Sequence, residues 1–184
     1  MKKTFDSTVT KLLIAVCLIV LSTLWTYQAT TSNLFVWDTI AYLFKWEHRI
    51  SQLNIENIYW MLTAFEVYNW HPLTWLSWAI DYQLWGGLDS WGYHFSNNVL
   101  HAINSVLVFI TVIALFALND PNPKHYRIST DKYSIIAAFF AAVAFALHPQ
   151  HVESVAWVAE RKDLLCQLFM LLTLLTYVKY VTCS

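Results

Sequence analysis

The stretch LHPQHVESVAWVAERKD, Leu147–Asp163, lies between two strongly apolar runs and decides how the sequence is interpreted. It holds two histidines, two glutamates, an aspartate and an Arg-Lys pair. The apolar runs on its two sides cover residues 135–147 and 164–178. Because polar groups are costly near hydrocarbon, so many of them at a membrane boundary predict a functional site.

The composition of the 184-residue chain is that of an integral membrane protein. Hydrophobic residues make up 58% and charged residues 12%, whereas soluble domains are about half apolar and about a quarter charged. The 10 Trp, 10 Tyr and 11 Phe are too many for a soluble surface. A net charge of −1 without a basic stripe predicts no nucleic-acid partner. The cysteines show no paired spacing and are expected to be buried thiols.

Four apolar ranges predict an all-α, polytopic membrane protein with a single membrane domain over residues 1–184. We expect spans at about 12–28, 97–118, 132–148 and 163–180, because about 20 apolar residues in a helix cross a bilayer. The first range follows a basic start but lacks a small-x-small cleavage site, which favours an uncleaved helix over a signal peptide. Alanines spaced four apart in the third range predict close helix packing.

The segment between the first two spans, 30–96, is expected to be a long outer loop that carries amphipathic helices. Apolar residues recur at helical spacing over 54–68 and 72–84, and aromatic residues are frequent throughout, which is typical of helices in the membrane interface. The polar, proline-containing segment 119–131 is expected to be a linker. Lys and Arg outnumber acidic residues at the two termini and in this linker. The positive-inside rule therefore predicts that these parts are cytoplasmic.

Two residues of the outer loop are candidates for chemistry. Asp38 follows the first span and could act as a general base toward a hydroxyl nucleophile, or it could be an ordinary solvated acid. His71 precedes a predicted helix start at Pro72 and could line a cavity, although helix capping or an interfacial position explains it equally well.

Polar residues at the start of the second span form another candidate group. His94 and His101 are seven residues apart and share a helix face, and Asn104 lies one turn further on. They could line a cavity for a lipid headgroup, or they could make ordinary hydrogen bonds between helices. Because only His101 is clearly inside a span, the sequence shows no stacked histidine pair for haem.

Arg161 and Lys162 stand on the outer side, where the positive-inside rule makes basic residues rare. A cation there needs a partner, and an anionic lipid phosphate is a natural one. The alternative is a set of salt bridges with Glu153, Glu160 or Asp163. A divalent metal bound by His148, His151 and Glu153 fits the ligand types, but the spacing matches no strong motif, so no metal or other cofactor is predicted.

Three segments carry a family resemblance, namely NWHPLTWLSWAIDYQLWG, WGYHFSNNVLHAINSVLVF and FALHPQHVESVAWVAERKDLLCQLFMLLTLLTYVKY. They resemble the N-terminal membrane region of the transmembrane and tetratricopeptide-repeat (TMTC-type) family over roughly residues 35–180. The resemblance implies a GT-C glycosyltransferase fold, here in part. It also implies a polyprenyl- or dolichyl-phosphate-linked sugar as donor, a Ser or Thr hydroxyl as acceptor, and an inner-membrane or endoplasmic-reticulum location in bacteria or eukaryotes respectively.

The resemblance also implies roles for single residues. Asp38 matches the first acid of the family's acidic pair, and Thr39 stands where the second acid is usual. The HPxHVES…ERKD motif places Arg161, Lys162 and Glu153, together with His148 and His151, near the donor phosphate.

Such proteins continue with further membrane helices and a repeat array. The chain is therefore expected to be the N-terminal part of an O-mannosyltransferase-like enzyme, inactive alone or completed by a further membrane subunit. The alternatives are a non-enzymatic membrane scaffold, which binds its partner through the alanine-rich third span, and a haem or quinone protein in electron transfer.

Overall fold

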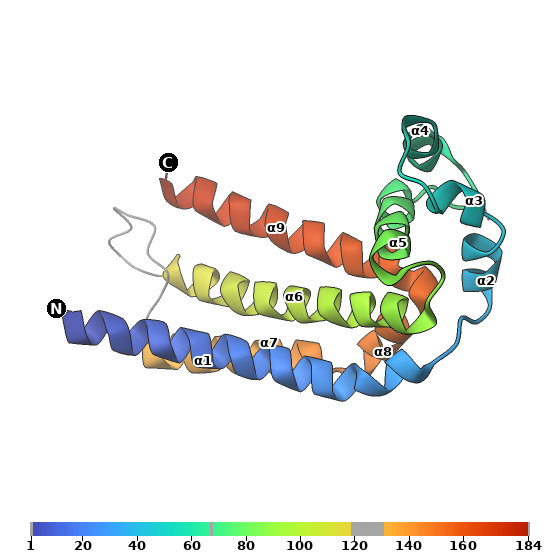
Figure 1. The fold of residues 1–184 in the computed structure, drawn as a ribbon. Helices are drawn as coiled ribbons and strands as arrows, with labels where there is room; N and C mark the ends of the chain where they lie inside the picture. Colours follow the sequence, from blue (N-terminus) through green and yellow to red (C-terminus); the bar gives the residue numbers. More distant parts are fainter. Residues whose placement is uncertain (1, 67, 119–130, 184) are drawn as a thin grey trace. The chain divides into compact units, whose positions relative to one another are not determined.

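A computed structural model describes residues 2–66, 68–118 and 131–183. Over these ranges the chain is helical, and its one β-type pairing is an isolated bridge between Glu66 and Asn69. Figure 1 shows the order of the helices along the chain. The expected all-α class is therefore confirmed for the described residues, whereas the predicted linker lies outside them except for Asp131.

The chain divides into two compact units that interleave along the sequence. Unit 1 consists of Met1–Thr26, His101–Pro149 and Gln167–Ser184. Unit 2 consists of Tyr27–Leu100 and Gln150–Cys166. The stretch Leu147–Asp163 therefore lies almost wholly in unit 2.

Unit 1 is built from long apolar helices. They are α1 (Lys2–Tyr27), most of α6 (Ser90–Ala117), α7 (Lys132–Ala146) and most of α9 (Arg161–Cys183). Its core includes Ile19 of α1, Phe109 of α6 and the fully buried Ala138 and Ala142 of α7. The expected close packing of alanines is thus found for this pair, because small side chains let helix backbones approach each other.

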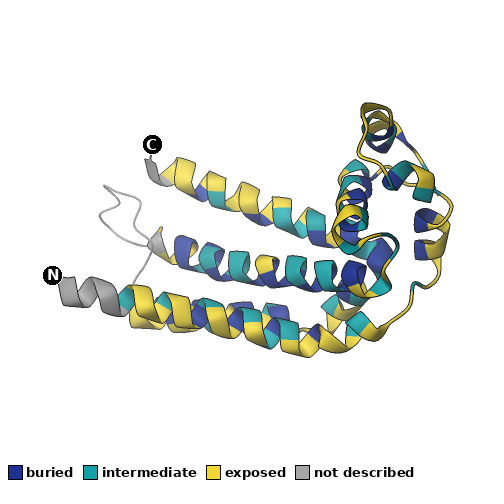
Figure 2. Cartoon of the chain, viewed as in Figure 1, coloured by how far each residue is buried: buried dark blue, intermediate teal, exposed yellow. Residues whose placement is uncertain are grey.

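Three helices among the described residues are long and apolar enough to cross a membrane, over Thr8–Ser32, Ser90–Phe116 and Val158–Val181. A fourth crossing would combine α7 with the segment Pro149–Ala156, which is bent against it by 47°. Proline lacks an amide hydrogen and clashes with the preceding turn, so the break falls at Pro149 as expected. Many large apolar side chains of these helices are exposed, as in the yellow faces of Figure 2, which suits contact with lipid. Three to four such helices are consistent with a polytopic membrane protein.

The expectation of buried thiols is wrong for the two cysteines whose side chains are described. Cys17 and Cys166 are both free and exposed. Exposure on an apolar helix leaves a thiol facing lipid, where a small hydrophobic side chain is tolerated.

Unit 2 contains short helices connected by tight turns. They are η1 (Gln28–Ser32), α2 (Asp38–Leu43), α3 (Glu47–Ile50), α4 (Ile55–Thr63), α5 (Pro72–Trp85), α8 (Val152–Ala156) and η3 (Val158–Glu160), with the start of α6 and α9. Asn54 caps α4, since its side chain accepts a hydrogen bond from Asn57 N at 2.8 Å. Pro72 begins α5, and Gly86 ends it in the left-handed conformation with φ 74°.

The core of unit 2 is aromatic. Trp75 and Trp78 of α5 are fully buried, with ring centroids 5.3 Å apart, and they pack with Tyr42 of α2 and Tyr93 of α6. Val158 and Ala159 of η3 close the same cluster. Segments that are more than a hundred residues apart in sequence therefore share one hydrophobic core, and this core fixes the positions of the polar residues around it.

Candidate functional site

A buried ion pair lies at the centre of unit 2. Arg161 is the first residue of α9 and is 2% exposed, and its Nη1 lies 2.5 Å from Oδ2 of Asp81 in α5. The side chain of Asp81 is itself only 6% exposed, and its Oδ1 accepts a hydrogen bond from Ser96 Oγ at 2.7 Å. Removing two charges from water is costly, so such a pair is stable only when further hydrogen bonds satisfy both groups.

The remaining donors of Arg161 are also satisfied inside unit 2. Nε donates to Asn97 Oδ1 at 2.6 Å, and Nη2 donates to the Tyr93 carbonyl at 2.8 Å. The guanidinium carbon lies 5.7 Å from the centre of the Tyr93 ring, within the range of a cation–π contact. Asn97 in turn donates to the Val155 carbonyl at 3.1 Å. One side chain thereby joins α5, α6, α8 and α9.

The acid that pairs with Arg161 is not one of the partners expected from the sequence, which were Glu153, Glu160 and Asp163. None of the acids within the motif pairs with Arg161 in the structure; its carboxylate is Asp81, eighty residues earlier. Sequence reasoning missed Asp81 because helical spacing over 72–84 does not indicate a partner eighty residues away in sequence. The signal that could have identified it is its position between Trp78 and Trp85, since an acid among tryptophans is expected to have a buried cationic partner.

Lys162 has a more open environment than its neighbour. Its side chain is 34% exposed, and its Nζ lies 2.9 Å from Oε1 of Glu160. The salt-bridge alternative considered for this pair of basic residues is therefore found for Lys162. Exposed ion pairs contribute at most about 1 kcal/mol, so an anionic ligand can compete with Glu160 for this ammonium group.

His71 lies in an aromatic enclosure of unit 2. It is 8% exposed, its ring packs against Tyr42 and Trp75, and its Nδ1 is buried without a hydrogen-bond partner. Burial, together with the positive charge of Lys162, lowers the pKa of His71 from 6.5 to about 4. The imidazole is therefore neutral at physiological pH and can exchange a hydrogen bond with a ligand hydroxyl.

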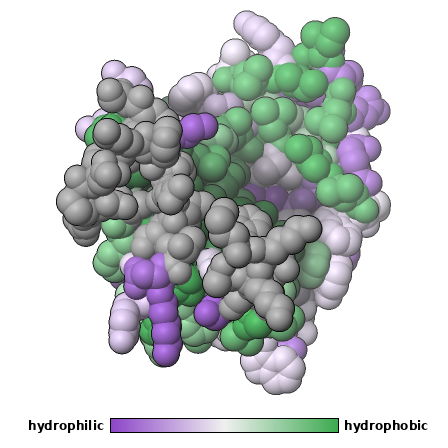
Figure 3. Space-filling model, turned by 90° about the vertical axis from the view of Figure 1, so that its left-hand side faces the viewer, coloured by the Kyte–Doolittle hydropathy of each residue, from purple (hydrophilic) through white to green (hydrophobic). Residues whose placement is uncertain are grey.

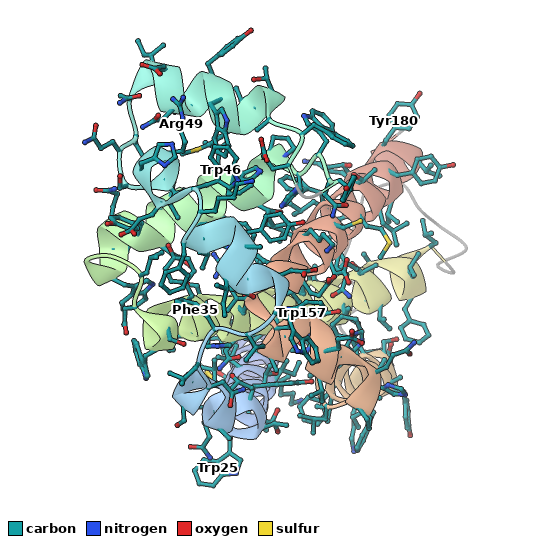
Figure 4. The ribbon with its side chains drawn as sticks, turned by 90° about the vertical axis from the view of Figure 1, so that its right-hand side faces the viewer. Trp25, Phe35, Trp46, Arg49, Trp157 and Tyr180 are labelled. Atoms are coloured by element: carbon teal, nitrogen blue, oxygen red, sulfur yellow. The ribbon has the colours of Figure 1, made fainter. Side chains whose placement is uncertain are left out.

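Asp38 begins α2 and is exposed. Trp37 before it adopts a positive φ of 51°, and its ring meets edge-on that of Trp157, which is labelled in Figure 4, with 5.3 Å between the ring centroids. Val158 and Ala159, which follow Trp157, share a core cluster with Tyr42 and Leu43 of α2. The segment that begins at Asp38 and the segment that precedes Lys162 are therefore packed against each other.

Thr39, at the position of the second acid in the family pattern, has a different environment from Asp38. It is 1% exposed, and its Oγ1 has no hydrogen-bond partner. A buried hydroxyl without a partner destabilises the fold. A carboxylate at this position would be directed into the core of unit 2 and not toward the exposed face that carries Asp38.

The other candidates fall into separate environments. His94 is buried in unit 2 and stacks on Phe35, with 6.4 Å between ring centroids. His101 is buried in unit 1, where its Nε2 lies 3.0 Å from the Ala146 carbonyl. Asn104, also in unit 1, is fully buried. His101 thus makes the ordinary helix-to-helix hydrogen bond that was one of its two interpretations.

The two histidines of the stretch Leu147–Asp163 belong to different units. His148 is exposed and belongs to unit 1, whereas His151 and the exposed Glu153 belong to unit 2. No group of three or more His, Cys, Asp or Glu side chains within residues 2–66, 68–118 and 131–183 could hold a metal ion.

Comparison with known proteins identifies relatives for about 60% of the chain. No protein-family model matches, and no solved structure matches. The human protein O-mannosyl-transferase TMTC4 is 40% identical over 111 residues, which are 60% of this chain and 15% of that protein. Tmtc2 of Drosophila melanogaster is 34% identical over 113 residues, covering 61% of this chain and 10% of that protein. Human TMTC2 is 34% identical over 112 residues, or 61% and 11% respectively.

The chain is homologous to part of the TMTC-family protein O-mannosyltransferases. The resemblance inferred from the three sequence segments is thereby confirmed. The chain spans only 10% to 15% of the length of the TMTC relatives named above. What those proteins do as a whole is therefore a basis for proposals about this chain and not a description of it.

Proposed function

We propose that this chain provides the donor site and the general base of a lipid-linked-sugar-dependent glycosyltransferase of the O-mannosyltransferase type. The observation that supports the proposal is the packing of α2, which begins at Asp38, against η3, which directly precedes Arg161 and Lys162. The names of the TMTC relatives supply the reaction class, and their resemblance supplies the polyprenyl- or dolichyl-phosphate-linked donor.

In the proposed reaction, the Asp38 carboxylate accepts the proton of an acceptor hydroxyl. The hydroxyl oxygen then attacks the anomeric carbon of the sugar, and the bond from that carbon to the donor phosphate oxygen breaks. The phosphate leaves with the electron pair of that bond, and the ammonium group of Lys162 stabilises its growing charge. The exposed Glu153 and the neutral His71 are proposed to bind sugar hydroxyls, and His151 lies two residues before Glu153 in the chain.

Arg161 is proposed to act through position and not by contact with the donor. Its hydrogen-bonding groups are directed to Asp81, Asn97, Tyr93 and Ser77, and it is 2% exposed. Because Arg161 is fixed, the adjacent Lys162 is held at the surface of unit 2. The roles expected for His94, His148 and Asn104 at the donor stay predictions.

The proposed topology follows the charge distribution of the sequence. Four crossings would place the termini in the cytoplasm, with the helices of segment 30–96 in the outer interface as part of a GT-C fold. In a variant whose three native cysteines are serine, we expect a membrane-impermeant thiol reagent to label Ser154→Cys in intact cells and not Tyr180→Cys. The opposite labelling pattern would invert the topology.

Donor binding tests the proposal with a matched pair of lysines. We expect Lys162→Gln to weaken binding of labelled polyprenyl-phosphate mannose by about 10-fold or more, because a charge-assisted hydrogen bond contributes about 1.5–3 kcal/mol. Lys45→Gln is the control, since Lys45 is a more exposed lysine of unit 2 whose Nζ lies 3.9 Å from Glu66. Equal affinity in both variants would contradict the assignment. Absence of donor binding with stoichiometric co-purification of a second membrane protein would instead support the scaffold hypothesis.

A further inference from the structure

Unit 1 carries a groove that the proposed reaction does not use. It lies between α1 and α7 and has a volume of about 630 Å³. Ile14 and Leu18 of α1 form one wall, and Ile136 and Phe140 of α7 form the other. The lining runs over residues 11–18 of α1 and 132–140 of α7, which corresponds to a length of about 12 Å at 1.5 Å per residue.

The walls of the groove are apolar and face outward. Phe140 is 64% exposed and Ile14 54%, whereas Ala15 and Ile135 at its floor are buried. Both helices are apolar, and α1 contributes to a candidate membrane span. An exposed apolar groove at this position is expected to contact the hydrocarbon of the bilayer.

Two lysines, Lys11 and Lys132, complete the lining of the groove. Both are exposed, and neither forms an ion pair or hydrogen bond within the described part of the chain. The neighbouring Asp131 is engaged elsewhere, because it caps α7 by accepting from Tyr133 N at 2.8 Å and from Ser134. Figure 3 shows hydrophilic side chains, in purple, directly beside hydrophobic ones, in green, on the face where the chain ends lie.

We propose that this groove binds one anionic glycerophospholipid. One acyl chain lies along the apolar walls, and the headgroup phosphate is held between the ammonium groups of Lys11 and Lys132. Lysine side chains at the end of a membrane helix extend toward the headgroups, where a phosphate supplies the charge that they lack within the chain.

Charge and size both suit a lipid in this groove. The volume lies within the range of about 300–1,000 Å³ that is usual for small-molecule sites. In the proposed topology the lysines are cytoplasmic, and the cytoplasmic leaflet is the one rich in anionic lipids.

Lipid retention by the purified full chain tests this site independently of sugar transfer. The chain is purified in mild detergent with equal amounts of phosphatidylglycerol and phosphatidylcholine, and bound lipids are counted by native mass spectrometry. We expect about one retained phosphatidylglycerol. The Lys11→Gln/Lys132→Gln variant should lose its preference for phosphatidylglycerol by roughly fivefold per lysine, the factor expected for one basic residue near an anionic surface.

Two further variants separate the lipid site from a general effect of charge or folding. Lys11→Arg/Lys132→Arg should retain the lipid, since the charges are kept. Lys179→Gln removes a lysine of unit 1 outside the groove and should also retain it. Equal retention of both lipids by the wild type, unchanged retention in the double glutamine variant, or preferential retention of polyprenyl phosphate would each overturn the proposal.

Discussion

Arg161→Met should be among the most damaging single substitutions in unit 2. It leaves the Asp81 carboxylate buried without a cation, and it removes the donors that satisfy Asn97 Oδ1 and the Tyr93 carbonyl. Breaking a buried ion pair from one side costs about 3–5 kcal/mol. For a chain of this length, 1 kcal/mol corresponds to about 2–4 °C in Tm, so the expected loss is about 6–20 °C.

The same reasoning predicts that the two partners are not additive. Asp81→Leu alone should cost a similar amount, because it leaves the Arg161 guanidinium buried and uncompensated. The double variant removes both charges together, so it should lose no more than either single variant, with a coupling energy of about 3 kcal/mol or more. Thermal unfolding followed by tryptophan fluorescence in detergent reports this directly, because Trp75 and Trp78 lie in the core of unit 2.

Lys162→Met is the matched control for this cycle. It removes the adjacent basic residue, whose partly exposed pair with Glu160 is expected to contribute less than about 1 kcal/mol. A Tm loss in Arg161→Met no larger than that in Lys162→Met would refute the structural role of Arg161. Additive losses in the double variant would refute the pairing with Asp81.

Three further predictions concern local features of unit 2. The pKa of His71 is about 4 in the folded chain and 6.5 when exposed, so the unfolded chain binds more protons between these two pH values. The free energy of unfolding should therefore fall by about 2 kcal/mol from pH 7 to pH 5. Unfolding of His71→Gln should lack this part of the pH dependence, whereas the exposed control His48→Gln should keep it. Gly92→Ala should lower stability by about 1–3 kcal/mol despite the better helix propensity of alanine, because a methyl group there would overlap the Trp85 ring. The check is restoration of the wild-type Tm by an added Trp85→Leu. An unchanged Tm in Gly92→Ala would disprove the overlap. Thr39→Val should be neutral or stabilising in the same unfolding assay, since it replaces a buried hydroxyl that has no partner, and a loss above about 1 kcal/mol would show that the hydroxyl has an important interaction.

Local signals in the sequence located most of the helices. Apolar runs predicted the long helices of unit 1, and Pro72 predicted the start of α5. These features depend on residues within a few positions of each other, which is why propensity and periodicity suffice to predict them.

The polar centre of unit 2 could not be predicted in the same way. The partners of Arg161 are 64 to 84 residues away in sequence, and no periodic pattern connects them. The stretch Leu147–Asp163 also forms three short helical segments before α9, namely η2 (Pro149–His151), α8 and η3, and the last two are separated by Trp157, which is extended with φ −100° and ψ 112°. Resemblance to a family singled out Arg161 and Lys162, but the partners of these residues depend on tertiary packing.

The division of the histidines between the two units shows the same limit. His94 and His101 share a helix face by spacing, yet His94 packs in unit 2 and His101 bonds within unit 1. Helix periodicity gives the face of a side chain but not the element that covers it.

A sugar-transfer assay tests the central proposal most directly. It measures transfer from labelled polyprenyl-phosphate mannose to acceptors in a membrane extract, and it compares the wild type with Asp38→Asn. In membranes that supply the further subunit expected from the sequence, the account predicts transfer by the wild type and a loss of about 100-fold or more in Asp38→Asn, the usual contribution of a general base. Donor binding should be preserved in Asp38→Asn, since the carboxylate acts on the acceptor. Transfer by Asp38→Asn at the wild-type rate, or no transfer by the wild type, would contradict the account.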